Sequence, residues 1–124
     1  MIEQLIEGAR RGVEARRAEV PQSDLEQRLS GRGEDRPFNE ALVRPGLSVI
    51  AEFKRRSPSA GAMVAATAAV DAQVAAYERG GAAAVSVLTD EPHFGGSLDV
   101  LRAARSARRL PIIRKDFITG PYQL

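Results

Sequence analysis

Two lysines and a glutamate are the residues of this sequence best suited to acid–base chemistry. Glu52 and Lys54 stand at the end of an apolar, β-branched stretch, and Lys115 stands at the end of another. Side chains two apart on a strand point to the same face, so Glu52 and Lys54 are expected to share one. A lysine ammonium can bind an anion or donate a proton. The alternative is a surface ion pair, which would contribute little.

Three apolar stretches predict the strands that position these groups, at residues 47–53, 83–88 and 110–113. Helical patterns at 67–79, where Gly80 or Gly81 is a good C-cap, and at 98–107 separate them. This alternation is typical of βα units in a parallel sheet. Thr89, Asp90 and Phe94 follow the second strand, and Asp116 and Phe117 follow Lys115. In a βα barrel the active site lies at the carboxyl ends of the strands, so these groups are expected at one edge.

Helices precede the first strand. Apolar residues at helical spacing predict an amphipathic helix over residues 2–19, and Pro21 ends it. Ser23 followed by Glu26 predicts a capping box for a second, shorter helix. A polar loop over 31–37 and a helical turn over 38–42 follow. We therefore divide the chain into a helical extension, residues 1–46, and a partial barrel, residues 47–124.

The two loops at this edge carry weaker signals. Ser57 lies in a turn-forming SPSAG segment within a loop over 54–61, which also fits a simple βα connection. In the loop over 89–96, Gly95 and Gly96 precede Ser97, a plausible N-cap. Backbone amides there could bind an anion, but a flexible turn explains two glycines equally well.

Composition excludes several classes of function. The 124 residues contain no cysteine and a single histidine, His93, which argues against a metal site. The formal charge is only +2, and arginines alternate with acids rather than forming the basic stripe of a nucleic-acid-binding protein. We find no apolar run long enough for a membrane span and no secretory signal. We expect no nucleic-acid or membrane partner and a cytoplasmic location.

Three segments together resemble the indole-3-glycerol phosphate synthases. They are IAEFKRRSPSAG at 50–61, YERGGAAAVSVLTDEPHFGGS at 77–97 and LPIIRKDFITGPYQL at 110–124. The resemblance implies an α/β fold of the (β/α)8 TIM-barrel type. The 124 residues would supply the N-terminal helical extension and the first three βα strands, about half of a barrel that typically needs ~250 residues.

The resemblance also implies a reaction. Family members are carboxy-lyases of tryptophan biosynthesis that convert 1-(2-carboxyphenylamino)-1-deoxyribulose 5-phosphate to indole-3-glycerol phosphate, without cofactor or metal. By position, Lys115 matches the general acid of ring closure, Glu52 a catalytic glutamate and Lys54 an anion-binding and acid–base lysine. Ser57, Phe94 and Phe117 match substrate-binding residues, the phenylalanines packing on the anthranilate ring. Ala60 and His93 depart from the family pattern, as does the uncharged segment 62–68.

Other readings stay open. Another phosphate-binding barrel of the pathway, such as a phosphoribosylanthranilate isomerase, fits the EFKRRSPS and RKDF segments poorly. A non-catalytic half-barrel that assembles with a partner chain would not need Glu52, Lys54 and Lys115. We expect a small phosphorylated substrate, no activity from residues 1–124 alone, and marginal stability or self-association, because unpaired strand edges would be exposed. A C-terminal half-barrel would complement the chain.

Overall fold

The computed structural model describes residues 1–65 and 68–124. The chain forms two compact units: residues 36–116, and residues 1–35 together with 117–124. The predicted start of a helix at Thr67 lies outside the described residues. No helix in the described part of the chain is long and apolar enough to cross a membrane.

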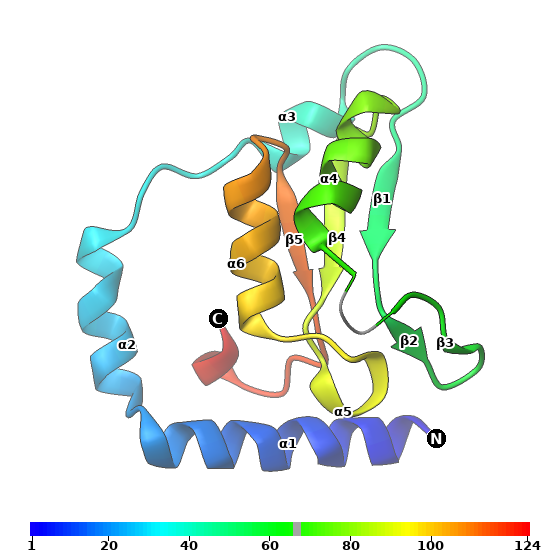
Figure 1. Ribbon diagram of the computed structural model, residues 1–124. Helices are drawn as coiled ribbons and strands as arrows, with labels where there is room; N and C mark the ends of the chain where they lie inside the picture. Colours follow the sequence, from blue (N-terminus) through cyan, green and yellow to red (C-terminus); the bar gives the residue numbers. More distant parts are fainter. Residues whose placement is uncertain (66–67) are drawn as a thin grey trace. The chain divides into compact units, whose positions relative to one another are not determined.

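A parallel sheet forms the centre of the larger unit (Figure 1). Its strands are β1 (Ile50–Phe53), β4 (Ala84–Leu88) and β5 (Ile112–Lys115), in the order β1-β4-β5. Parallel neighbours need a crossover connection, and helices α4 (Val70–Arg79) and α6 (Leu98–Ala107) occur in the two connections. The predicted α/β class with a parallel sheet is confirmed.

The strands begin later than the apolar stretches suggest. Pairing of β1 with β4 starts at Ile50 opposite Ala84, and Leu47 remains 95% exposed. The Val49 carbonyl still accepts the Ala83 N–H at 2.9 Å, but the paired register begins one residue later, so residues 47–49 lie outside the strand. Strand β5 begins at Ile112 rather than residue 110 and extends to Lys115. Pro111 has no N–H for the ladder, although its carbonyl accepts a bond from the Val85 N–H at 2.9 Å.

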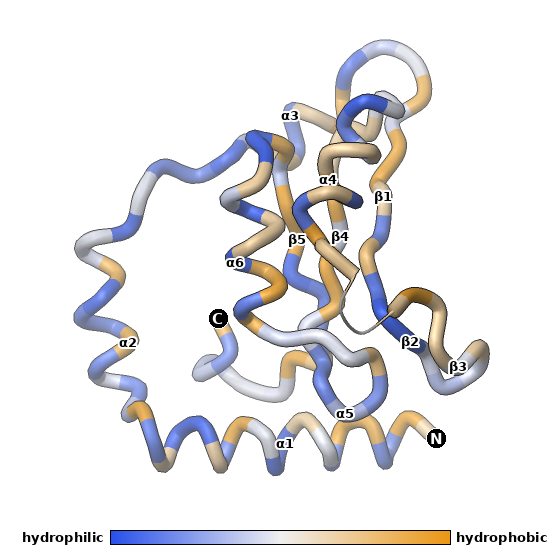
Figure 2. Tube along the Cα trace, in the orientation of Figure 1, coloured by the Kyte–Doolittle hydropathy of each residue, from blue (hydrophilic) through white to orange (hydrophobic). Residues whose placement is uncertain are grey.

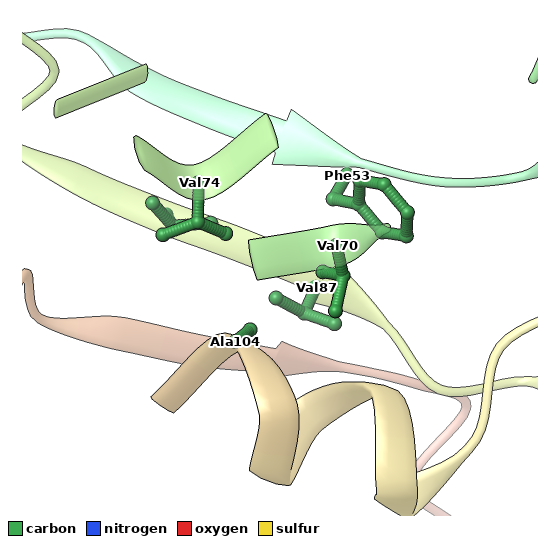
Figure 3. Packing of buried hydrophobic residues seen from close by; sticks show 6 residues of the cluster. Phe53, Val70, Val74, Val87 and Ala104 are labelled. Carbon is green, nitrogen blue, oxygen red and sulfur yellow. The ribbon is translucent and has the colours of Figure 1, made fainter. Parts of the chain in front are cut away.

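Helices α4 and α6 pack together on one face of the sheet (Figure 1). Strand β4 is buried along its whole length and is markedly apolar (Figure 2). Its alternate residues Val85 and Val87 point toward the helices, as the two-residue period of a strand requires. The buried cluster is drawn in Figure 3 and consists of Phe53, Val70, Val74, Val85, Val87 and Ala104. Each fully buried valine contributes about 1.5 kcal/mol or more.

The ends of α6 are capped in two ways. The Ser97 hydroxyl accepts the Val100 N–H at 3.2 Å, which confirms Ser97 as the N-cap. At the other end, the Arg36 guanidinium donates to three carbonyl oxygens, those of Arg105 at 2.7 Å, Arg108 at 2.6 Å and Leu110 at 3.0 Å. The Arg105 carbonyl belongs to the last turn of α6, and those of Arg108 and Leu110 lie in the segment that follows the helix. Nothing in the local sequence around Arg36 indicated this long-range cap.

The other helix end and the loops show where local patterns succeed and fail. Gly81, with φ of +87°, follows α4 as expected for a helix C-terminus. The predicted turn α3 (Phe38–Leu42) forms. Two segments expected to be loops contain short elements instead. The first holds an antiparallel pair, β2 (Arg56–Ser57) and β3 (Gly61–Ala62), and the second holds the helical turn α5 (Glu91–Phe94).

The smaller unit is helical. It contains α1 (Ile2–Glu19), α2 (Gln22–Arg28), and the 3-10 turns η1 (Leu29–Gly31) and η2 (Pro121–Gln123). The Tyr122 hydroxyl lies 3.0 Å from the Arg16 carbonyl oxygen and 2.8 Å from that of Val20, at the end of α1. The Arg17 guanidinium lies over the Tyr122 ring, 5.9 Å from its centroid. The predicted helix over 2–19 is confirmed.

The predicted capping box of the second helix is wrong. Pro21, not Ser23, occupies the N-cap of α2, so Ser23 already lies inside the helix. Its hydroxyl lies 3.5 Å from Asp24 Oδ1, and the Glu26 carboxylate accepts from the Gln22 amide at 2.8 Å. A proline has no N–H to donate and its φ is fixed near the helical value, so Pro21 suits the position just before the helix, which begins ahead of the serine.

Candidate active site

Glu52, Lys54 and Lys115 meet at the carboxyl edge of the parallel sheet. The Lys54 ammonium lies 3.2 Å from Glu52 Oε1, and the Lys115 ammonium lies 2.8 Å from Glu52 Oε2. Each carboxylate oxygen therefore pairs with a different lysine. Glu52 and Lys54 share a face even though β1 ends at Phe53. The cluster carries a net positive charge, which favours an anionic ligand.

Strand order explains how residues 63 positions apart come together. Strand β4 lies between β1 and β5, so Lys115 must reach across it to Glu52. Ser86 lies opposite Glu52 on one side and opposite Ile113 on the other. Its small side chain leaves room for that reach, and its buried hydroxyl lies 3.4 Å from Glu52 Oε2. Ser86 was missed by sequence reasoning, although it is a lone polar residue within an apolar strand.

The charge state of Glu52 follows from its neighbours. Burial by itself raises the pKa of this carboxyl, because it disfavours the charged form. Hydrogen bonds from Lys115 and Lys54 and attraction to their charges outweigh burial, so the pKa lies below the ordinary value. Glu52 is thus a carboxylate at neutral pH. It can orient two ammonium groups.

The phenol of Tyr77 holds the backbone of Glu52 in place. The Tyr77 hydroxyl, on α4, donates to the Glu52 carbonyl oxygen at 2.9 Å. Burial, the largest cause, raises the pKa of Tyr77, so the phenol keeps the proton it donates. Helix α4 therefore contributes to the position of Glu52 without presenting a group at the cluster itself.

Exposure distinguishes the three charged side chains. Glu52 is 29% exposed and Lys54 is 31% exposed, whereas Lys115 is 57% exposed. Lys115 therefore has the most exposed side chain of the three. A lysine held by a carboxylate but open to solvent is suited to donate a proton to a substrate oxygen.

The predicted substrate-binding residues lie in different settings. Ser57 is buried in the β2–β3 hairpin, where its oxygen accepts the Ala60 N–H at 3.1 Å and lies 3.4 Å from Ser59 Oγ. Its visible role is to close the turn. Phe94 is the half-buried last residue of α5. Phe117 belongs to the smaller unit, where its carbonyl accepts from the Gln123 amide at 2.9 Å. Ser57 and Phe94 share a unit with the lysine–glutamate cluster.

The glycines before α6 do not present free amides to an anion. The Gly95 N–H donates to the Glu91 carbonyl at 3.1 Å and the Gly96 N–H donates to the Asp90 carbonyl at 3.0 Å. A Cβ at position 96 would fall 2.1 Å from the Leu88 carbonyl oxygen, so only glycine fits there. The alternative of a turn plus N-cap therefore explains this segment.

His93 and a hollow beside α5 are two further features of the loops after the strands. His93 Nδ1 lies 3.1 Å from Asp90 Oδ1, and no metal-binding group of three or more His, Cys, Asp or Glu occurs among residues 1–65 and 68–124. A hollow of about 540 Å³ lies beside α5, with Arg55, Arg56 and Gly96 in its wall. Arg56 donates to the Glu91 and Pro92 carbonyls at 3.1 and 2.8 Å. None of the six predicted site residues lines this hollow, so the lysine–glutamate cluster defines the candidate site.

Known proteins match the chain over its whole length. The family model described as indole-3-glycerol phosphate synthase matches residues 2–124. A protein of that name from Mycobacterium avium (strain 104) is 45% identical over all of this chain and 45% of its own length. One from Parafrankia sp. (strain EAN1pec) is 46% identical over 99% of this chain and 46% of its own length. One from Mycobacterium tuberculosis (strain ATCC 25177 / H37Ra) is 44% identical over 100% of this chain and 45% of its own length. The chain spans about half the length of these curated relatives.

Proposed function

Because the chain belongs to the indole-3-glycerol phosphate synthase family, we propose that it supplies one part of a synthase active site. The reaction converts 1-(2-carboxyphenylamino)-1-deoxyribulose 5-phosphate to indole-3-glycerol phosphate, with loss of carbon dioxide and water. The observation that carries this proposal is the pairing of one carboxylate with two lysines at the carboxyl edge of a parallel sheet. That edge is where barrel enzymes bind and convert substrates.

The chemistry assigns a role to each charged group. A ring carbon attacks the ribulose C2 carbonyl carbon, and Lys115 protonates the carbonyl oxygen as the new C–C bond forms. The carboxylate leaves as carbon dioxide, the new hydroxyl leaves as water after a second protonation, and loss of a proton completes the indole. Glu52 orients the two ammonium groups. Lys54 binds a substrate anion and assists the later acid step.

The remaining assignments rest on position in the family pattern. Ser57 contacts the substrate, and Phe94 and Phe117 pack against the anthranilate ring. The charge of the lysine pair suits the carboxylate and phosphate of the substrate. No cofactor or metal takes part in this proposal. A cytoplasmic location belongs to it as well, because it follows from the assignment to tryptophan biosynthesis.

The proposed whole is a (β/α)8 barrel of which these residues form a helical extension, 1–46, and the first three strands, within 47–124. The curated relatives are about twice as long, and phosphate-binding loops of such barrels often follow the seventh and eighth strands. We therefore propose that residues 1–124 alone are inactive. A C-terminal half-barrel, or less completely a second copy of this chain, would cover the exposed strand edges.

The test compares the chain alone with the chain fused to the part of the Mycobacterium avium relative that lies beyond the matched region. Formation of indole-3-glycerol phosphate from the synthetic substrate is followed by the fluorescence of the indole product. We expect turnover from the fusion and none from residues 1–124. The matched control is Asp99→Asn in the fusion, which changes an exposed ion pair on α6 and should leave turnover unchanged. A fusion that unfolds cooperatively yet shows no turnover would contradict the proposal.

A further inference from the structure

A second polar network lies on the opposite face of the same strand ends. Arg114 and Asp116 flank Lys115 in sequence, and Thr89 follows β4. Arg114 Nε donates to Thr89 Oγ1 at 3.0 Å, and Arg114 Nη2 donates to Asp116 Oδ2 at 2.8 Å. The Thr89 hydroxyl donates to the same Asp116 oxygen at 2.7 Å. The three side chains form a closed triangle of hydrogen bonds.

Strand geometry places this triangle behind Lys115. Arg114 lies opposite Val87, a residue of the buried cluster on the helix-covered face. Alternate residues of a strand share a face, so Arg114 extends to the helix side while Lys115 extends to the Glu52 side. Asp116 follows the strand end and joins Arg114 through the hydrogen bond between them. The Thr89 N–H also donates to the Lys115 carbonyl oxygen at 3.0 Å. The triangle and this bond hold the backbone of Lys115 on both sides.

We propose that Arg114, Thr89 and Asp116 are positioning residues that hold Lys115 against Glu52 for proton donation. This inference rests on the proposed function and assigns the three residues no contact with substrate. Asp116 is 8% exposed and Arg114 is 22% exposed, against 57% for Lys115. A buried charged pair is often no more stabilising than well-packed apolar residues of similar volume. The directional hydrogen bonds among Arg114, Thr89 and Asp116, by contrast, fix the positions of the ends of β4 and β5 relative to each other.

The first experiment measures position without requiring activity. Carbon-13 carboxyl NMR titration gives the pKa of Glu52 in residues 1–124 for the unaltered chain, Thr89→Val and Asp116→Asn. Release of Lys115 removes a cation from Glu52, so both variants should raise the pKa of Glu52 toward the ordinary value. Loss of the Asp116 charge alone would act in the opposite direction, since removal of a neighbouring negative charge lowers a carboxyl pKa. Asp99→Asn, which alters an exposed Asp–Arg pair, is the matched control.

The second experiment uses the fusion described above. Thr89→Val should lower kcat about 10- to 100-fold with little change in KM, because a small misplacement of a catalytic group has effects of that size. Thr89→Ser keeps the hydroxyl, so its kcat and its Glu52 pKa should match those of the unaltered protein and differ from those of Thr89→Val. This pair carries the test if Asp116→Asn does not fold.

The outcomes separate the two proposals. A rise of the Glu52 pKa in Thr89→Val, reversed in Thr89→Ser, with no turnover from the unaltered fusion, would support the positioning network and contradict the proposed function. Turnover from the unaltered fusion, with the Glu52 pKa and kcat unchanged in Thr89→Val, would overturn the positioning network. Equal losses in Thr89→Val and Thr89→Ser would also overturn it, because the hydroxyl would then be irrelevant.

Discussion

Two cations near the opposite ends of strand β5 contrast in their partners. Near its amino end, Arg36 donates to the carbonyl oxygens of Arg105, Arg108 and Leu110. At its carboxyl end, Lys115 pairs with the side chain of Glu52. Burial, and then the charges of Arg105 and Arg109, lower the pKa of Arg36. Arg36 is thus partly desolvated where it bonds to backbone carbonyl oxygens. The Lys115 side chain, in contrast, is 57% exposed and bonds to the carboxylate of Glu52.

The two sets of contacts differ in what they contribute to the fold. Backbone carbonyls at a helix end need donors wherever the helix ends, so the Arg36 contacts are explained by folding alone. The Lys115–Glu52 pair satisfies no backbone group, and an ion pair this exposed adds little stability. In βα barrels, groups at the carboxyl ends of strands serve catalysis and those at the other ends serve stability. In the larger unit, Arg36 bonds near the amino end of β5 and Lys115 lies at its carboxyl end.

Replacement of Lys115 should give the largest effect and should act on catalysis. In the fusion, Lys115→Gln removes the proposed general acid, which should lower kcat about 100- to 10,000-fold. The free energy of unfolding should change by less than about 0.5 kcal/mol, because the lost pair is exposed. Steady-state kinetics and urea unfolding measure the two effects. A variant with near-normal kcat would remove Lys115 from the mechanism.

Replacement of Arg36 should give a smaller effect of the opposite kind. Arg36→Ala leaves three carbonyl oxygens without their donor, which should lower the free energy of unfolding by about 2 kcal/mol. Far-UV circular dichroism in urea measures this, with a lower midpoint and an unchanged slope. Arg102→Ala, which removes an exposed ion pair on α6, is the control and should change stability by about 0.5 kcal/mol or less. If Arg36→Ala and Arg102→Ala lowered the free energy of unfolding equally, the Arg36 contacts would not have the stabilising role given to them here.

Sequence patterns predicted the elements that depend on nearby residues. The periodicity of residues 2–19 and the hydroxyl of Ser97 are local signals, and both the helix and the N-cap form. The pairing of Glu52 with Lys54 follows from their two-residue spacing. The meeting of Glu52 with Lys115 required strand order, which the alternation of strands and helices suggested and the parallel sheet provides.

The features that were missed depend on tertiary partners. Ser86 becomes informative only when the register places it opposite Glu52. The cap by Arg36 joins residues about 70 positions apart, so no window of sequence contains it. The start of β1 at Ile50 is decided by where β4 begins. Local hydrophobicity cannot supply this information, because register is a property of two strands.

The smallest expected effect is the pH dependence that Glu52 adds to stability. Its pKa is lower in the folded chain than the ordinary glutamate value of about 4.3. Its charged form is therefore favoured by folding, so its contribution is complete above about pH 4.3 and disappears as pH falls through the lower folded pKa. Urea unfolding of the unaltered chain and of Glu52→Gln should differ more at pH 7 than at pH 3. Glu40→Gln, which alters an exposed glutamate of α3, is the matched control. If Glu52→Gln were instead more stable than the unaltered chain at pH 7, with the difference shrinking toward pH 3, burial and not the two lysines would dominate this carboxyl.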